Sequence, residues 1–197
     1  MPGSLAEALD QPLPKPGRDL LGYASVRVLE ALLEAVLALE FLERGYTRNA
    51  AGKAFQAWRA LTGALLALES DRVAGRLGGE EQRRWLLEKA VPRVPSSRLK
   101  FLARLLKEAG YLDFPAYTAV ALDLHDYQYH GPDPDLEYSK YRGRGEAAYE
   151  MLVLLTELAE IVKEQVRSRL EREGKWTQSH EKALQRLWGK LAPGRQR

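Results

Sequence analysis

The chain of 197 residues contains no cysteine. This excludes disulfides, thiolate zinc sites, iron–sulfur clusters and cysteine nucleophiles. No apolar run approaches the roughly 20 residues that a membrane span requires. The N-terminus also lacks a charged segment followed by an apolar one, so we expect no secretory signal. The absence of thiols is typical of a reducing compartment, and we expect a cytoplasmic protein.

Asparagine is almost absent too, because Asn49 is the only one in the chain. Arginine and glutamate are abundant, so thermolabile amides are few and ion-pairing groups are many. This balance favours a thermophilic source.

Positive charge is concentrated at the C-terminal end of the chain. The net charge is +3, and residues 163–197 carry ten basic against four acidic side chains. Such a basic segment can neutralise the phosphates of a nucleic acid. The alternative is that these lysines and arginines only solvate a surface helix and its end.

The apolar pattern is helical throughout, and no segment alternates with the period of a strand. A stripe over 47–70 shows the spacing best, with Ala54, Trp58, Leu61, Leu65 and Leu68. The same segment carries glycine at 52 and 63, which costs helix stability and is typical of close helix packing. We expect helices over 19–44 (ended by Gly45), 47–70 (capped by Thr47 or Asn49), 80–90, 96–109, 113–126, 141–173 and 179–190 (capped by Ser179).

These helices predict an all-α protein, an antiparallel helical bundle with extra short helices and a C-terminal helix. The first two form a hairpin because only a short link joins them. Trp58 belongs to the core, whereas Trp85, Trp176 and Trp188 are candidates for anchoring a partner subunit in a homodimer. We expect an N-terminal arm (1–18), the bundle (19–173) and a C-terminal helix with a basic tail (174–197).

Polar and aromatic chemistry is concentrated in residues 125–146. This segment holds two of the three histidines, His125 and His130, and the tyrosines Tyr127, Tyr129, Tyr138 and Tyr141. The tyrosines either anchor the loop or form a surface on which bases stack beside Arg142 and Arg144. Asp123, His125, Asp126 and His130 show no recognised metal-ligand spacing, so we expect no metal and no cofactor.

A second candidate site lies at the start of the second helix. The segment from Gly45 to Lys53 fails as a P-loop, because six residues separate its glycines and no strand precedes it. Arg48 and Lys53 near a helix N-terminus can still bind a phosphate. The alternative for both is ordinary surface solvation.

Two segments together resemble a known family. The first is RNAAGKAFQAWRALTGALL (48–66), and the second runs from Tyr129 through PDPDLEYSKYRGRGEAAYEMLVLLTELAEIV to Val162. They are similar to HEPN domains, helical bundles found beside minimal nucleotidyltransferases and in prokaryotic toxin systems, and in more detail to the archaeal PaREP family. The resemblance covers 20–169. It implies a helical bundle, dimerisation, and an association with RNA, nucleotides or a nucleotidyltransferase partner.

Ribonucleases of the HEPN group use an arginine followed four to six residues later by a histidine. This sequence departs from that pattern, because no arginine lies within seven residues before His125 or His130. A metal-independent ribonuclease would have to assemble a histidine with Arg142 and Arg144 through the fold. The sequence therefore favours a non-catalytic dimeric interaction module; the alternatives are that ribonuclease and a purely structural homo-oligomer.

Overall fold

The computed structural model describes residues 12–192, and within this range every regular element is helical. The predicted all-α bundle is confirmed. The elements in chain order are α2 (Leu20–Glu43), α3 (Thr47–Leu68), α4 (Ser70–Gly75), α5 (Glu80–Trp85), the π-turn η1 (Leu86–Ala90), α6 (Val91–Arg93), the 3-10 turn η2 (Ser96–Arg98), α7 (Leu99–Glu108), α8 (Phe114–His130), α9 (Arg144–Ile161), the π-turn η3 (Val162–Val166), α10 (Arg167–Arg172) and α11 (Gln178–Leu191). Most of the predicted arm, 1–11, and the end of the tail, 193–197, lie outside the described residues.

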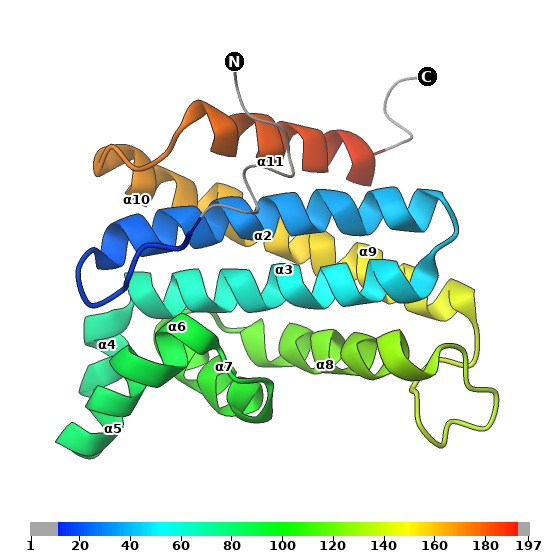
Figure 1. Cartoon of the computed structure of the whole chain (residues 1–197), viewed down its shortest axis with the longest axis horizontal. Helices are drawn as coiled ribbons and strands as arrows, with labels where there is room; N and C mark the ends of the chain where they lie inside the picture. Colours follow the sequence, from blue (N-terminus) through cyan, green and yellow to red (C-terminus); the bar gives the residue numbers. More distant parts are fainter. Residues whose placement is uncertain (1–11, 193–197) are drawn as a thin grey trace.

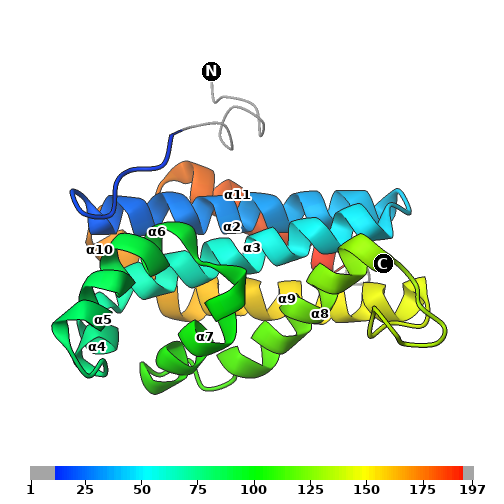
Figure 2. The same ribbon diagram turned by 60° about the horizontal axis from the view of Figure 1, so that its bottom comes forward.

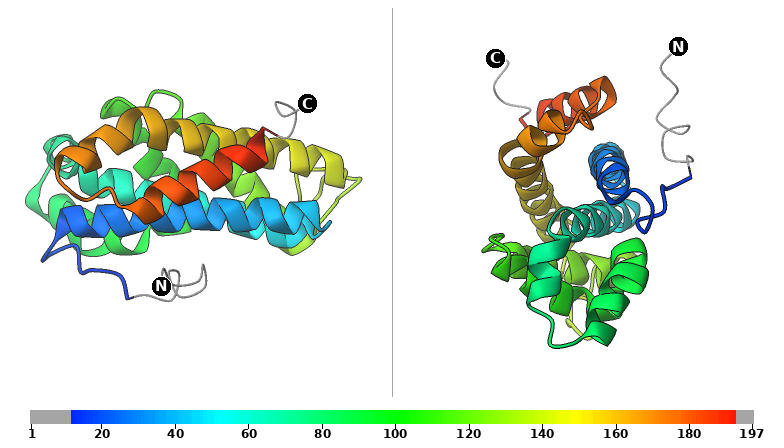
Figure 3. Two further views of the ribbon diagram at one scale, coloured as in Figure 1. Left: turned by 90° about the horizontal axis from the view of Figure 1, so that it is seen from above. Right: turned by 90° about the vertical axis from the view of Figure 1, so that its left-hand side faces the viewer.

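Helix α3 lies at the centre of the bundle (Figure 1). Helix α2 runs antiparallel to it as the predicted hairpin (Figure 2), and the end-on view shows α9 and α11 on the same side of α3 as α2 (Figure 3). The shorter helices α4 to α8 cover the opposite side of α3, as the end-on view shows (Figure 3). Within the described residues, no helix has the length and apolar character that crossing a membrane would require.

The turn between α2 and α3 closes as predicted at Gly45, which has a φ of 80°. The amide of Gly45 donates to the carbonyl of Leu42, and that of Tyr46 donates to Phe41, both at 2.9 Å. These two bonds satisfy carbonyls that the helix end leaves free, and glycine adopts the required left-handed conformation without a Cβ penalty.

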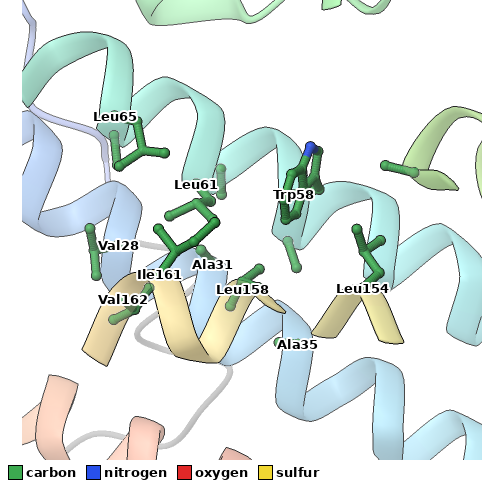
Figure 4. Close-up of a cluster of buried hydrophobic side chains, with 14 of the residues drawn as sticks. Val28, Ala31, Ala35, Trp58, Leu61, Leu65, Leu154, Leu158, Ile161 and Val162 are labelled. Carbon is green, nitrogen blue, oxygen red and sulfur yellow. The ribbon is translucent and has the colours of Figure 1, made fainter. Parts of the chain in front are cut away.

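The core is formed where α2, α3 and α9 meet (Figure 4). Leu61 and Leu65 of α3 are fully buried in this cluster, and the buried Trp58 also stacks on Phe114 of α8 at 4.5 Å. The α2 contribution includes Ala31 and Ala35, which let the two axes approach closely. The surroundings of Gly63 are equally tight, because a Cβ there would lie 3.1 Å from Val94 Cγ2.

Several predicted helix ends are wrong. Helix α8 continues to His130 rather than ending near 126, and α9 begins at Arg144 rather than near 141. The helical path also continues through Pro92, after the π-turn η1, in which the Val91 amide donates to the Leu86 carbonyl. A π-turn shifts the hydrogen-bond register, and this shift accommodates a residue that has no amide hydrogen to donate.

The predicted caps also differ from the structure. Tyr46 occupies the N-cap of α3 without a side-chain bond, while Thr47 lies inside the helix. Thr177 replaces Ser179 as the N-cap of α11, in a capping box with His180. The usual box has Glu or Gln at that third position, which is why the sequence did not indicate it.

Helix α11 packs along α2 and buries Ala183, Leu184 and Leu187. Ion pairs join the two helices at their edge, Arg186 with Glu40 and Lys190 with Glu43. The division of the chain at 173 and 174 stays a prediction.

Candidate functional site

A polar cavity of about 440 Å³ opens between the first half of α3 and the end of α8. Its lining consists of two cations, three side-chain amides, one glycine and no carboxylate: Arg48, Asn49, Gly52, Lys53, Gln56 and Gln128. We call it the α3–α8 cavity. Five of these residues come from one helix, where spacings of three and four bring side chains to the same face.

Arg48 ties the two helices together at the rim of the cavity. Its Nε donates to the carbonyl of Gln128 at 3.0 Å, and its Nη2 donates to the carbonyl of Tyr129. These carbonyls belong to the last turn of α8, which has no partners within its own helix. Gly131, with a φ of 73°, leaves room for this arrangement, because a Cβ there would lie 3.3 Å from Arg48 Cδ.

The other cation, Lys53, is fixed by an acidic residue from α2. Its Nζ lies 2.9 Å from one carboxylate oxygen of Glu34 and 3.2 Å from the other. Glu34 is buried, so the pair compensates a carboxylate that would otherwise lack a charge partner. Lys53 is therefore a partly neutralised cation, and Arg48 contributes the stronger positive field.

The floor of the cavity depends on Gly52. A Cβ at this position would lie 2.5 Å from Gln128 Oε1, closer than real contacts allow. Gln128 therefore lies directly across the bare backbone of α3. The first turn of α3, which carries Arg48 and Asn49, has no side-chain cap, so no capping side chain compensates the positive end of this helix.

An aromatic row flanks the cavity. The ring of His125 stacks on Phe55 at 4.0 Å and meets Tyr129 edge-on at 5.2 Å. Burial lowers the pKa of His125, against the opposing effect of Asp126. Its Nδ1 is buried and has no hydrogen-bond partner among the described residues. The lowered pKa favours the neutral imidazole, which packs here as an aromatic ring.

The four tyrosines of residues 125–146, two on α8 and two in the loop that follows it, divide into two anchors and two exposed side chains. Tyr127 and Tyr141 are buried, and the Tyr127 hydroxyl lies 3.1 Å from Thr47 Oγ1. Burial also raises the pKa of Tyr141. Tyr129 and Tyr138, by contrast, are more than half exposed. Only the exposed pair is available for stacking on a ligand.

The loop 131–143 is itself ordered by Asp133. Its carboxylate accepts the backbone amides of Tyr138 at 2.6 Å and Ser139 at 3.0 Å. These bonds hold the pKa of Asp133 below its usual range. His130 stacks on Tyr138 at 5.5 Å, so its ring contacts the loop rather than the α3–α8 cavity.

Arg142 lies in a different hollow from the α3–α8 cavity. That hollow, of about 630 Å³, is lined by Leu136, Lys140, Tyr141, Arg142, Gly145, Glu146, Tyr149 and Glu150. It contains carboxylates as well as cations, and neither histidine lines it. Arg144 is exposed at the first residue of α9. Neither cavity joins His125 or His130 to Arg142 and Arg144.

The described residues contain no group of three or more His, Cys, Asp or Glu side chains placed to hold a metal. Several cations of the described part of the basic C-terminal segment, 163–192, have acidic partners. Arg169 pairs with the buried Glu69 at 2.7 Å, Lys175 lies 3.7 Å from Asp19, and Arg167 contacts Glu171 and Glu181.

Sequence reasoning identified Arg48 and Lys53 but missed the amides Asn49, Gln56 and Gln128. One signal was visible, because the only asparagine of the chain lies one residue from Arg48. Gln128 carried no such signal, since its position over Gly52 depends on how α8 crosses α3.

The fold and the cavity define an all-α bundle protein with a cationic, amide-lined cavity between two of its helices. The chain belongs to the archaeal PaREP1/PaREP8 family, whose model matches residues 26–152. The matched range covers the hairpin, the α3–α8 cavity and the first half of α9. Neither the curated proteins nor the solved structures contain a significant match.

Proposed function

We propose that this protein is a non-catalytic, HEPN-like interaction module that binds the phosphate groups of RNA or of a nucleotide in the α3–α8 cavity. The observation that carries the proposal is the cavity lining, which combines Arg48 and Lys53 with three amides and no carboxylate. Two of these residues, Arg48 and Asn49, lie in the uncapped first turn of α3, at the positive end of the helix dipole.

The mixed-charge hollow beside Arg142 is a poorer phosphate site, because Glu146 and Glu150 line it together with the cations. The basic C-terminal segment is poorer as well, since Arg167, Arg169 and Lys175 have acidic partners. Among the described residues, His125 and His130 line neither the α3–α8 cavity nor the hollow beside Arg142, which favours binding without cleavage.

The test places a carboxylate in the cavity without changing its shape. Gln56→Glu should weaken binding of a fluorescently labelled single-stranded RNA by about tenfold or more at low salt, because it sets a negative charge against the phosphate. Binding should also decrease as salt increases, in proportion to the number of phosphates contacted. Fluorescence anisotropy measures both effects, and gel analysis of the same samples should show intact RNA.

Gln178→Glu is the matched control. It makes the same change on an exposed residue of α11, outside the α3–α8 cavity, and should leave the affinity unchanged. If the two variants weaken binding equally, or if the unmodified protein binds neither RNA nor nucleotide at low salt, the proposed function is wrong. Cleaved RNA would contradict its non-catalytic part.

A further inference from the structure

We infer that the α3–α8 cavity recognises a nucleobase, so that its ligand is a nucleoside phosphate rather than any phosphate. The inference rests on the proposed function and narrows it. The amides of Asn49, Gln56 and Gln128 would contact the base edge, while Arg48 and Lys53 lie toward the phosphate.

The chemistry of the amides supports this assignment. A side-chain amide offers a donor and an acceptor side by side, the pattern that base edges also present, and Asn and Gln form paired hydrogen bonds with adenine. The cavity collects the only asparagine and two of the eight glutamines of the chain. A site that recognised phosphate alone would need cations and backbone amides, and three side-chain amides would add little to it.

These amides keep hydrogen-bonding capacity for a ligand. Among the described residues, the side chains of Asn49 and Gln128 form no hydrogen bond with protein groups. Gln56 accepts one bond from Arg59 Nη1 at 3.1 Å, which fixes its orientation and leaves its amide hydrogens available.

Two glycines leave the space that two cavity side chains occupy. Gly52 makes room for Gln128, and Gly131 makes room for Arg48. Glycine inside a helix lowers helix stability, so its presence at 52 needs a structural reason. The position of Gln128 supplies that reason, which makes Gly52 a positioning residue for base recognition.

A stacking surface is adjacent. Tyr129 follows Gln128 and lies outside the cavity lining; its carbonyl accepts a hydrogen bond from Arg48, and the residue is 59% exposed. His125 contacts the Tyr129 ring edge-on and stacks in turn on Phe55, so the position of the Tyr129 ring is supported by two further rings. Every base has a π-face, so a braced and exposed tyrosine beside the amides supports a bound base whatever its identity.

The experiment compares ligands that share a phosphate and differ in the base. Isothermal titration with the four ribonucleoside 5′-monophosphates, ribose 5-phosphate and inorganic phosphate should show at least one nucleotide binding about tenfold tighter than ribose 5-phosphate. Gln128→Leu should reduce the affinity for that nucleotide to the level of ribose 5-phosphate. The affinity for ribose 5-phosphate itself should not change.

Gly52→Ala tests the positioning role, because it displaces Gln128 without removing any polar group from the cavity. It should lower the ratio of nucleotide to ribose 5-phosphate affinity, whereas Gly189→Ala, in open space on α11, should not. Circular dichroism checks that each variant is folded.

Equal binding of all nucleotides and ribose 5-phosphate would overturn base recognition and leave phosphate binding intact. Binding of none of these ligands, and of no RNA, would instead overturn the proposed function itself. Retention of base preference in Gln128→Leu and Gly52→Ala alike would show that these amides do not recognise the base.

Discussion

Single residues in this protein matter most where a backbone must lie close to a side chain. Gly63 is such a position, since an added Cβ would meet Val94, Arg27 and Tyr23 at 3.1 to 3.3 Å. All three neighbours are buried, so none can move into solvent. Gly189 is the opposite case, a helical glycine with no atom within 4 Å of an added Cβ.

We therefore expect Gly63→Ala to destabilise the protein although alanine favours helices. The propensity gain of about 1 kcal/mol should be outweighed by an overpacking cost of about 1–3 kcal/mol. Gly189→Ala should gain about 1 kcal/mol, equivalent to roughly 2–4 °C in melting temperature for a chain of this size. Thermal unfolding followed by circular dichroism measures both changes. An increase in stability for Gly63→Ala would contradict the close packing of α2, α3 and the segment around Val94.

At the scale of elements, His180 joins α11 to α2 in addition to the apolar contacts and ion pairs between the two helices. Its Nδ1 accepts the Thr177 amide at 3.2 Å, which places the proton on Nε2, and Nε2 donates to the Ser25 carbonyl at 2.8 Å. Protonating Nδ1 would remove the acceptor of the capping box. Burial lowers the pKa of His180, with a smaller opposing effect from the Ser25 carbonyl.

The lowered pKa predicts that stability depends on pH. In the unfolded chain the histidine takes up a proton below about pH 6.5, while the folded chain resists it. The unfolded state then binds more protons, so the free energy of unfolding should decrease as the pH falls below that value and be fully retained above it. Denaturant titrations between about pH 5 and 8, with Trp176 beside His180 as a reporter of the attachment, measure the effect.

His180→Gln keeps an acceptor for the capping box and removes the titration. It should flatten the pH dependence more than His125→Gln, because His180 is buried whereas His125 is only half-buried. A slope that survives in His180→Gln would assign the acid sensitivity to other groups.

The elements also show what a sequence can and cannot predict here. The hairpin, its turn at Gly45 and the stripe on α3 follow from local periodicity and from one glycine, and all are confirmed. The end of α8 does not follow from local periodicity, because its last turn is stabilised by residues of α3. The Tyr127 hydroxyl contacts Thr47, and Arg48 donates hydrogen bonds to the carbonyls of Gln128 and Tyr129. Of the residues that line the α3–α8 cavity, the sequence indicated only Arg48 and Lys53. The placement of Gln128 depends on how α8 crosses α3, which local sequence patterns do not predict.

For the whole molecule, the surfaces that suggested a dimer are used within the chain. The small residues of α3 are buried against α2, and Trp85, Trp176 and Trp188 pack against the core. Exposed apolar side chains include Leu136 in the loop and Tyr149 and Leu152 on α9, and Leu136 and Tyr149 line the same hollow. Lys140 and Arg142 lie there beside Glu146 and Glu150. A patch with both signs of charge can complement itself across a two-fold axis.

We therefore predict a homodimer that forms through the exposed face of α9. Tyr149 is 66% exposed and Leu152 is 40% exposed, one helical turn apart, and association would remove both from water. Light scattering in the micromolar range should give twice the chain mass of 22.2 kDa. The variant Tyr149→Lys with Leu152→Lys should give the mass of one chain. Leu112→Lys, a control at a 69% exposed leucine between α7 and α8, should remain dimeric. A single-chain mass for the unmodified protein would contradict the dimer, and a dimeric double variant would move its interface away from α9.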